Sequence, residues 1–511
     1  MLRIPRAYAW LSLLIVLSPM FAVGQKQLSS EQRTARYLES IQQRPPLLVA
    51  FLKDMPKGGD LHVHLSGAVY AESFIDYAAE DGLCVDHTTS ILIAPPCDPC
   101  EKYANKPAIA CAYRDHVLYN QIIDAWSMRN WNPGEESGHD HFFATFDKFG
   151  LAGLLHTGDM LAETARRAAS DHLQYLELMH TADGGQSAQL GAKIGWDENL
   201  GSLREKLLTG GLKDVVASTR KTLEADEGKM RSVLKCGTAD ADPGCAVTVR
   251  YLYQVLRGLP PEQVFAQILT GFELAQADSR FVGLNLVMPE DWYVPMRDFD
   301  LHMRMLDYLH EIYPKVHISL HAGELAPGLV PPEGLHFHIR ESIERGHAER
   351  IGHGVDVMYE SDPMQLLREM TQHNVLVEIC LTSNDVILAV SGDHHPFPVY
   401  RQHGVPVALA TDDEGVSRSD MTNEYLRAVE NYNLAYDDVK RLARQSLEHS
   451  FLSGASLWAE TRDFHRVDAC TADDPRQEKA SARCQKLLNG SERAQAQWRL
   501  EGEFVKFESK F

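Results

Sequence analysis

The chain has 511 residues, enough for one large α/β barrel with insertions or for roughly two or three average domains. Hydrophobic residues make up 44% and charged residues 24%, which is typical of a folded, water-soluble chain and excludes a disordered one. The formal net charge of −21 argues against nucleic acid or an anionic membrane as a partner, because phosphates would be repelled.

Residues 1–24 have the layout of a signal peptide. Arg3 and Arg6 precede an apolar run from Ala7 to Phe21, and small residues follow at Ala22 and Gly24. The run is short for a membrane span, so we expect cleavage, with an uncleaved anchor as the alternative. The mature protein is then expected to be secreted or periplasmic, with no membrane contact after cleavage.

Cysteine usage agrees with export. Cys380 lies in an apolar strand pattern and is expected to be a buried free thiol. The remaining cysteines lie in segments that read as loops or insertions, and an even set predicts disulfides in an exported chain. The locally isolated pairs are expected to bond as Cys236–Cys245 and Cys470–Cys484. The other four allow three connectivities, which the sequence does not distinguish: Cys84, Cys97, Cys100 and Cys111.

A helical lead-in over residues 25–55 precedes alternating short apolar runs and longer helical patterns. The runs that predict strands are Asp60–His64, Tyr175–Met179, Val282–Val287, Val316–His321, Arg350–His353, Val375–Ile379 and Val407–Thr411. This alternation is typical of parallel β/α units, and we predict an α/β fold, a (β/α)₈ TIM barrel, over residues 56–462. A disulfide-containing insertion is expected after the first strand, at about residues 84–138, and a helical extension at residues 463–511.

Histidines and carboxylates recur at the ends of the predicted strands. His62 and His64 end the first strand and point to the same face, because side chains two apart on a strand share a face. Other predicted strands end in His321-Ala322-Gly323-Glu324, in Gly352-His353-Gly354 and in Asp412-Asp413. Since catalytic groups of (β/α)₈ enzymes come from the carboxyl ends of several strands, these residues are expected to meet in one site.

The residue types predict a role for each member of this set. Imidazoles and a carboxylate suit Zn²⁺ as ligands. The predicted ligands of one zinc ion per chain are His62, His64, His321 and Asp412. Glu324 and His353 then remain as acid/base groups beside the metal, and Asp413 is free to hold the substrate.

Three other motifs are expected to be unrelated to this site. Pro96-Cys97-Asp98-Pro99-Cys100 matches half of the zinc signature of cytidine deaminases, but no H-x-E precedes it and disulfides are favoured. His139-Asp140-His141 opens a helical pattern, so surface or pocket-rim histidines are expected there. His394-His395-Pro396 is expected to lie in a loop or at a helix start.

Together these motifs resemble the adenosine/AMP deaminase family. The matching stretches are Pro56-Lys57, Leu61–Ala68, His321–Glu324, Gly352–Gly354, Glu378–Asn384, His395-Pro396, Gly404–Val407 and Thr411–Asp413. The resemblance runs from about residue 50 to 460, and the signal peptide and insertion look most like the secreted, growth-factor-related branch. It implies a zinc-dependent deaminase that converts adenosine and 2′-deoxyadenosine to inosine and ammonia. The insertion is then expected to form a homodimer surface or a lid.

The resemblance also implies roles around the purine. A zinc-activated water would attack C6 with the help of His353 and Asp412, and Glu324 would protonate N1. Asp413 would hydrogen-bond N7, while His64 is expected at the substrate as well as at the metal.

Three positions depart from the family pattern. Ser66 stands where the family usually has Asp near the ribose, and Met288 stands where it usually has Gly beside purine N3. Glu414 replaces a Pro after the paired aspartates. These departures leave another aminopurine or a modified purine nucleoside open as substrate. A third alternative is an exported binding protein without activity, although the intact Glu324 and His353 argue against it.

Overall fold

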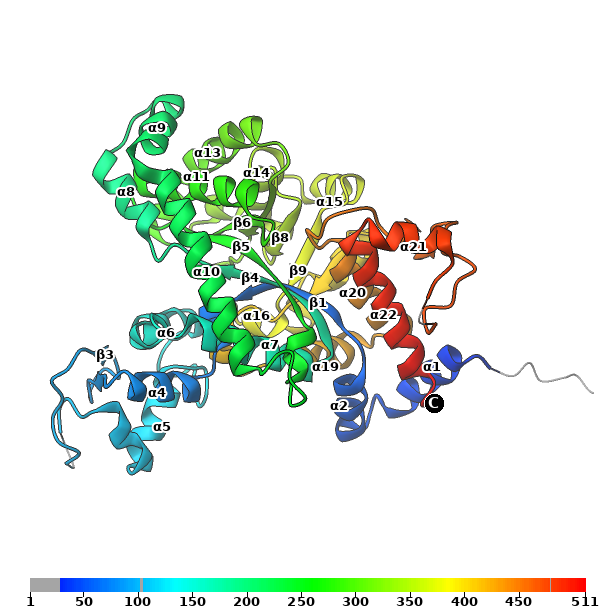
Figure 1. Cartoon of the computed structure of the whole chain (residues 1–511), viewed down its shortest axis with the longest axis horizontal. Coiled ribbons are helices and arrows are strands. Elements are labelled where there is room, and N and C mark those ends of the chain that lie inside the picture. Colours follow the sequence, from blue (N-terminus) through cyan, green and yellow to red (C-terminus); the bar gives the residue numbers. More distant parts are fainter. Residues whose placement is uncertain (1–27, 102–103, 478) are drawn as a thin grey trace, which may run out of the picture.

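The computed structural model describes residues 28–101, 104–477 and 479–511, so the predicted signal peptide lies outside the described residues. Within these residues, eight parallel strands form one sheet that curls into a nearly closed barrel (Figure 1). In order around the barrel they are β1 (Gly58–His64), β4 (Leu173–His180), β5 (Thr248–Leu256), β6 (Phe281–Val287), β7 (His317–Ala322), β8 (Arg350–His353), β9 (Leu376–Ile379) and β10 (Val407–Leu409). The predicted (β/α)₈ fold is confirmed.

The seam between β10 and β1 is closed by residues of the predicted site. The Asp412 amide donates to the His62 carbonyl at 2.9 Å, and the His64 amide donates to the Asp412 carbonyl at 3.2 Å. Asp412 has a φ of 58°, a left-handed conformation that is uncommon outside glycine and is found at functional positions. Closure of the barrel therefore also brings the two ends of the site together.

The third barrel strand, β5, was not among the strands predicted from the sequence. Arg250 and Gln254 interrupt its apolar pattern, and the disulfide loop that ends at Cys245 lies just before it. Tyr251 and Tyr253 are fully buried on one face of β5, whereas Gln254 lines a pocket. Its place in the barrel thus accounts for the polar residues that make β5 unlike an apolar strand in the sequence.

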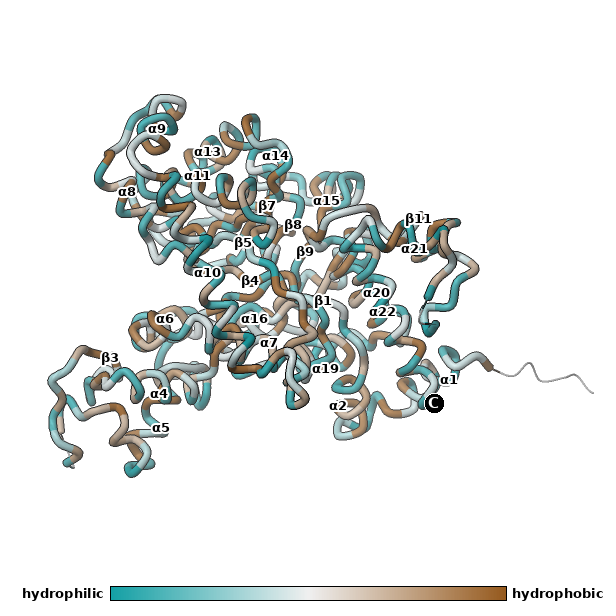
Figure 2. Tube along the Cα trace, viewed as in Figure 1, coloured by the Kyte–Doolittle hydropathy of each residue, from teal (hydrophilic) through white to brown (hydrophobic). Residues whose placement is uncertain are grey.

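Helices cover the outside of the barrel, and Figure 2 shows hydrophobic residues along the strands and interspersed with hydrophilic ones along the helices. The lead-in consists of α1 (Ser30–Ile41) and α2 (Pro45–Asp54). The later helices up to the end of the barrel are α3 (Leu65–Ala68), α4 (Ala71–Glu80), α6 (Gly138–Gly153), α7 (Thr157–Ser170), α8 (Gln186–Ile194), α9 (Leu200–Leu207), α10 (Lys213–Val233), α11 (Pro261–Ala277), α12 (Tyr293–Arg297), α13 (Phe299–Ile312), α14 (His338–Glu344), α15 (Pro363–Gln372), α16 (Leu381–Leu388), α17 (Phe397–His403), α18 (Glu414–Ser417), α19 (Met421–Tyr432) and α20 (Tyr436–Glu448). Short 3₁₀ or π turns are η1 (Ile109–Tyr113), η2 (Leu208–Leu212), η3 (Pro243–Ala246), η4 (Pro332–Leu335), η5 (Val357–Tyr359) and η6 (Gly392–His394).

The insertion follows α4 and projects from one side of the barrel in Figure 1. It contains the short strands β2 (Cys84–Val85) and β3 (Leu92–Ile93) and the helix α5 (His116–Ala125). Its cysteines pair as Cys84–Cys97 and Cys100–Cys111, which selects one of the three open connectivities. The predicted bonds Cys236–Cys245 and Cys470–Cys484 are present, and Cys380 is a buried free thiol as expected.

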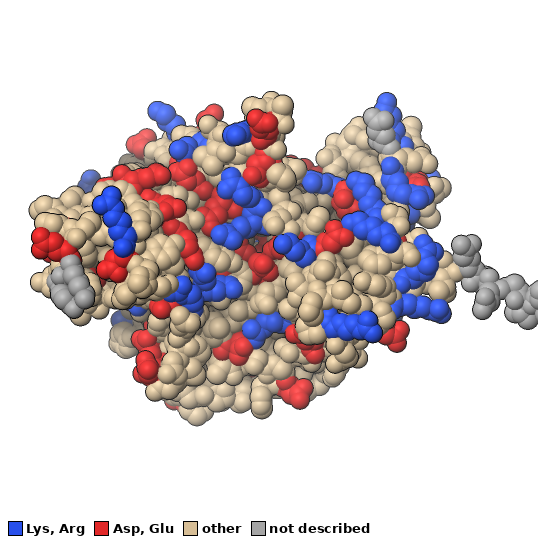
Figure 3. Space-filling model, turned by 90° about the horizontal axis from the view of Figure 1, so that it is seen from below, with Lys and Arg blue, Asp and Glu red and all other residues tan. Residues whose placement is uncertain are grey.

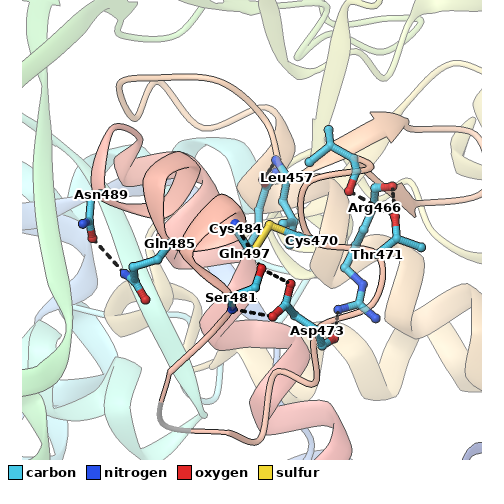
Figure 4. The surroundings of a disulfide bond; sticks show 11 residues. Leu457, Arg466, Cys470, Thr471, Asp473, Ser481, Cys484, Gln485, Asn489 and Gln497 are labelled. Carbon is cyan, nitrogen blue, oxygen red and sulfur yellow. Dashed lines mark hydrogen bonds between the residues drawn. A yellow bond between two sulfur atoms is a disulfide. The ribbon is translucent and has the colours of Figure 1, made fainter.

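The C-terminal part adds a hairpin of β11 (Trp458–Glu460) and β12 (His465–Arg466) and the helices α21 (Ala482–Asn489) and α22 (Glu492–Glu508). Figure 4 shows the Cys470–Cys484 disulfide beside the carboxylate of Asp473. That carboxylate accepts hydrogen bonds from the amide and the hydroxyl of Ser481, the N-cap of α21. The disulfide and the cap together fix the loop before α21.

The surface carries both signs of charge. On the face seen in Figure 3, Lys and Arg are interspersed with Asp and Glu. Among the described residues, no helix has the length and apolar character needed to cross a bilayer.

A candidate metal centre and active site

Four buried side chains converge at the carboxyl ends of β1, β7 and β10. They are His62, His64, His321 and Asp412, the predicted metal ligands. Nε2 of His64 lies 3.2 Å from Nε2 of His321, and Oδ1 of Asp412 lies 3.3 Å from Nε2 of His64 and 3.5 Å from Nε2 of His62. Four ligands placed tetrahedrally at about 2.0–2.1 Å from a zinc ion are separated by about 3.3 Å. The spacing therefore fits a small divalent ion.

The polar atoms of this cluster also lack other partners. Nε2 of His62 is buried and has no hydrogen-bond partner in the described protein. The Nδ1 atoms of His64 and His321 each face an amide oxygen and so carry the proton of a neutral ring, which leaves two Nε2 lone pairs facing one another. A buried polar group without a partner is costly unless an ion or water completes it. The donor set thus fits a metal by chemistry as well as by spacing.

Each imidazole of the cluster is held through its other nitrogen. The pairs are His62 Nδ1 with Glu378 Oε2 at 2.6 Å, His64 Nδ1 with Gln254 Oε1 at 2.9 Å, and His321 Nδ1 with Asn285 Oδ1 at 2.8 Å. Such bonds fix the ring orientation and direct Nε2 toward the metal. None of the three partners was predicted, because none stands at a strand end and only the fold pairs it with a histidine.

Glu378 belongs to a buried ion network inside the barrel. Nε of Arg350 donates to Oε1 of Glu378 at 2.6 Å, and Nη2 of Arg350 donates to Oε2 of Glu177 at 2.6 Å. Burial opposes ionisation of Glu378, but Arg350 and His62 outweigh it and hold the pKa of this carboxyl below its ordinary value. Arg350 thus bridges two buried glutamates, one of which contacts the candidate metal ligand His62.

Glu324 follows the β7 strand and lies in the same site. Burial, with the neighbouring carboxylates Asp412 and Glu290, raises its pKa well above the ordinary value, which favours the protonated form of this carboxyl. Its backbone is fixed by Oε2 of Glu290, which accepts the amides of Gly323 and Glu324 at 2.9 and 3.1 Å. Gly323 has a φ of 73°, and a Cβ there would meet Oδ1 of Asp356 at 2.4 Å, so the turn requires glycine.

His353 ends β8 with a φ of 69°, and its ring packs 4.8 Å from that of His62. Burial lowers the pKa of His353 to about 3, which leaves the ring neutral. Its Nδ1 lies 3.0 Å from Nδ2 of Asn384, and its Nε2 is buried without a partner among the described residues. The structure thus places a neutral imidazole, with one free nitrogen, beside the metal cluster.

A cavity of about 350 Å³ opens over these groups. Its acidic and metal-binding end is formed by His64, His321, Glu324, Asp412 and Asp413. Its apolar wall is formed by Phe142, Phe143, Phe146, Leu256, Val287, Met288, Pro289 and Trp292. Ser66, Asp147 and Gln254 complete the lining, which includes no Lys or Arg among the described residues. The volume suits a ligand the size of a nucleoside.

All four residues predicted to bind substrate line this cavity, namely His64, Ser66, Met288 and Asp413. Met288 has a φ of 93°, a backbone conformation that favours glycine, and its Sδ accepts the Gly258 amide at 3.3 Å. Burial and the adjacent Asp412 raise the pKa of Asp413 well above its ordinary value. Glu414, the third position that departs from the family pattern, is buried and is not among the residues that line this cavity.

The motifs set aside in the sequence have different outcomes. Cys97 and Cys100 are in disulfides, as expected. His139 lies in α6, where its ring is largely buried and its Nε2 contacts Oδ1 of Asp291 at 2.9 Å, and neither residue is among those that line the cavity. His395 does lie between a short turn and a helix, but the expectation that it is unrelated to the site was wrong: its Nε2 contacts Oδ1 of Asn384 at 3.0 Å.

Comparison with known proteins finds sequence similarity to adenosine deaminases. A family model described as adenosine deaminase matches residues 214–457. Adenosine deaminase of Yersinia pseudotuberculosis is 36% identical over 137 residues, 27% of this chain and 38% of the relative. That of Clostridium acetobutylicum is 31% identical over 153 residues, 30% of this chain and 42% of the relative. The chain thus spans about two fifths of the length of these curated relatives.

Solved structures share the fold. An N6-methyl-AMP deaminase from Arabidopsis thaliana has a TM-score of 0.52 at 20% identity, covering 79% of this chain and 94% of that one. An ADAL–IMP complex has a TM-score of 0.51 at 19% identity, with the same coverage. The family match begins after His62 and His64, so it is the barrel geometry that brings these residues to the matched part of the chain.

Proposed function

We propose that the chain is a member of the adenosine deaminase family that hydrolytically removes the 6-amino group of a purine nucleoside, with adenosine and 2′-deoxyadenosine as substrates; the family-model match and the curated relatives support this. The observation that carries this proposal is the pairing, in one cavity, of a cluster that could hold a metal ion with the buried carboxyl of Glu324, whose pKa is raised. Hydrolytic deamination needs both an activated water and an acid for the ring.

The ligands of one Zn²⁺ per chain would be His62, His64, His321 and Asp412. A zinc ion supplies Lewis acidity and lowers the pKa of a water molecule to about 7. The carboxyl of Glu324 would hold the proton that passes to N1 of the purine. The carboxyl of Asp413, whose pKa is raised by burial and by Asp412, would in its protonated form donate a hydrogen bond to N7, which has only a lone pair to offer. The phenylalanines of α6 would cover the base and exclude bulk water.

The pocket lining favours a nucleoside over a nucleotide. A phosphate that enters a partly buried site loses hydration and needs a cationic or amide partner. The described lining offers no Lys or Arg, and the carboxylate of Asp147 would repel a phosphate. The proposed substrate therefore differs from the nucleotides named for the structural neighbours, because it carries no phosphate.

A substituted aminopurine is the second candidate substrate. The apolar wall at Leu256, Met288 and Trp292 offers contact area to an apolar substituent on the purine or sugar, and Met288 fills the place where the family usually has glycine. We also propose that the protein is secreted or periplasmic, which its disulfides support because such bonds persist in oxidising compartments. We also propose that the insertion forms the contact surface of a homodimer.

One assay tests the function. Purified protein loaded with zinc is incubated with adenosine, 2′-deoxyadenosine, AMP and 6-substituted purine nucleosides, and product formation is followed by ultraviolet absorbance. We expect turnover of adenosine and at least tenfold lower kcat/KM for AMP, about 1.4 kcal/mol. Glu324→Gln should keep the metal and lose about 10²-fold in kcat. Turnover of another aminopurine without adenosine would favour the second candidate, and no turnover with metal bound would refute both.

A further inference from the structure

A chain of hydrogen bonds runs from a backbone amide to His353. The Phe397 amide lies 3.0 Å from Nδ1 of His395, and Nε2 of His395 lies 3.0 Å from Oδ1 of Asn384. Nδ2 of Asn384 lies 3.0 Å from Nδ1 of His353. All three side chains are buried, with at most 2% of their surface exposed, so water does not compete for these contacts.

The donor and the acceptor at each of these hydrogen bonds follow from the first contact, in which the Phe397 amide donates. A backbone amide is always a donor, so Nδ1 of His395 must accept and its neutral ring carries the proton on Nε2. That proton is donated to Oδ1 of Asn384, which turns the amide nitrogen of Asn384 toward His353. Nδ1 of His353 therefore accepts, and the proton of the neutral ring is on Nε2.

The opposite arrangement is disfavoured at two contacts. If His353 carried a proton on Nδ1, that N–H would face the amide N–H of Asn384. Rotating the Asn384 amide would relieve this contact but would place its NH₂ group against the Nε2–H of His395. Because both groups are buried, a donor facing a donor leaves one polar group without a partner and costs its desolvation free energy.

We propose that Asn384 and His395 are positioning residues that hold His353 in the Nε2–H tautomer, so that His353 acts on the reaction as a hydrogen-bond donor. The inference rests on the proposed deamination, because it concerns the free Nε2 of His353 beside the metal cluster. In this tautomer His353 stabilises negative charge on an attacking oxygen by donation and does not accept the proton of the water. This differs from the acid/base role expected from the sequence.

The key variant, Asn384→Asp, reverses the direction of the hydrogen bond to His353 and keeps a polar side chain of similar size at position 384. In Asn384→Asp a carboxylate would accept from an Nδ1–H of His353, which leaves Nε2 as a lone pair. We expect kcat to fall about 10- to 100-fold with KM within about threefold and zinc content unchanged, because a donor is lost at the reacting atoms. A role limited to anchoring the ring predicts near wild-type kcat for Asn384→Asp and a loss only for Asn384→Ala.

A second pair of variants tests the far end of the chain. His395→Leu removes the donor to Asn384 and should lower kcat, whereas His395→Gln retains an amide donor and should recover part of it. His394→Ala is the matched control, because His394 is the exposed neighbour and has no contact with Asn384. Equal kcat for the Leu, Gln and Ala variants would overturn the proposal.

The tautomer can also be read without turnover. In zinc-loaded protein labelled with ¹⁵N-histidine, ring correlations distinguish a protonated from an unprotonated Nδ1, and a His353→Gln sample assigns the signals. We expect an unprotonated Nδ1 on His353 in the wild type and a protonated one in Asn384→Asp. A protonated Nδ1 in the wild type would refute the tautomer even if the protein deaminates adenosine. Conversely, the expected spectrum without turnover of any aminopurine would refute the proposed function alone.

Discussion

Glu378→Gln is the substitution that best distinguishes an effect on metal affinity from an effect on the stability of the barrel. Oε2 of Glu378 lies 2.6 Å from Nδ1 of the ligand His62, and both side chains are fully buried. The amide keeps the volume and one acceptor oxygen but removes the charge. The bond to His62 then changes from a charge-assisted to a neutral one, which weakens the basicity of the ligand.

The structure sets the size of the effect. A hydrogen bond to a charged group contributes about 1.5–3 kcal/mol and a neutral one about 0.5–1.5 kcal/mol, so the change costs about 1–2 kcal/mol. At about 1.4 kcal/mol per factor of ten, zinc affinity should fall roughly 5- to 30-fold. Glu177→Gln is the matched control, because Glu177 pairs with the same Arg350 at the same 2.6 Å and is equally buried. It touches none of the predicted metal ligands among its described contacts.

Metal affinity is measured by titrating the metal-free full-length variants with Zn²⁺ against a chelating dye, and stability by urea denaturation with zinc present and absent. We expect both variants to lose stability, but only Glu378→Gln to lose zinc affinity beyond fivefold. The reasoning is refuted if the two variants lose zinc affinity equally, or if Glu378→Gln binds zinc as the wild type does.

Three further predictions concern the acid, the pocket and the pH dependence of stability. Glu290→Gln weakens the two bonds from the amides of Gly323 and Glu324, by about 2 kcal/mol in sum, and should lower kcat about 30-fold with zinc content unchanged. In the same steady-state assays the neighbouring control Asp291→Asn should change kcat less than about threefold. Phe146→Ala removes an aromatic contact of about 1 kcal/mol and should raise KM for adenosine about fivefold with little change in kcat; an unchanged KM would place the base elsewhere. Burial raises the pKa of Glu424 from 4.5 to about 7, so the folded protein holds this proton more tightly than the unfolded chain, and the contribution is complete below about pH 4.5 and lost as pH rises through 7. Glu424→Gln should therefore reduce the fall in the free energy of unfolding between pH 4.5 and 8 by about 3 kcal/mol in urea denaturation, and an unchanged pH dependence would contradict the raised pKa.

The cluster of candidate metal ligands was predictable because a simple rule places its members. Side chains at the carboxyl ends of barrel strands meet on one face, so His62, His64, His321 and Asp412 needed only strand ends to be recognised. Their partners Gln254 and Asn285 lie within strands, and the register that pairs them with a ligand is set by contacts distant in sequence. Local patterns carry no information about such pairs.

The same limit explains the strand and the histidine that were misjudged. The strand Thr248–Leu256 mixes polar and apolar residues, because one end lines the pocket and the other reaches the surface. His395 stands in a short connection whose composition is that of any loop. Only the packing of η6 and α17 against α16 brings it to Asn384 and, through Asn384, to His353.

The pairing of the first helices with α22 has a consequence for folding. Nε of Arg33 donates to the carbonyl of Phe511, 478 residues away, and the ring of Phe51 packs 5.0 Å from that of Phe507. During synthesis α1 and α2 emerge long before α22, so their apolar faces stay uncovered while the whole barrel is made. Such late contacts slow the last stage of folding. Until α22 is made, these two helices therefore lack part of their packing surface.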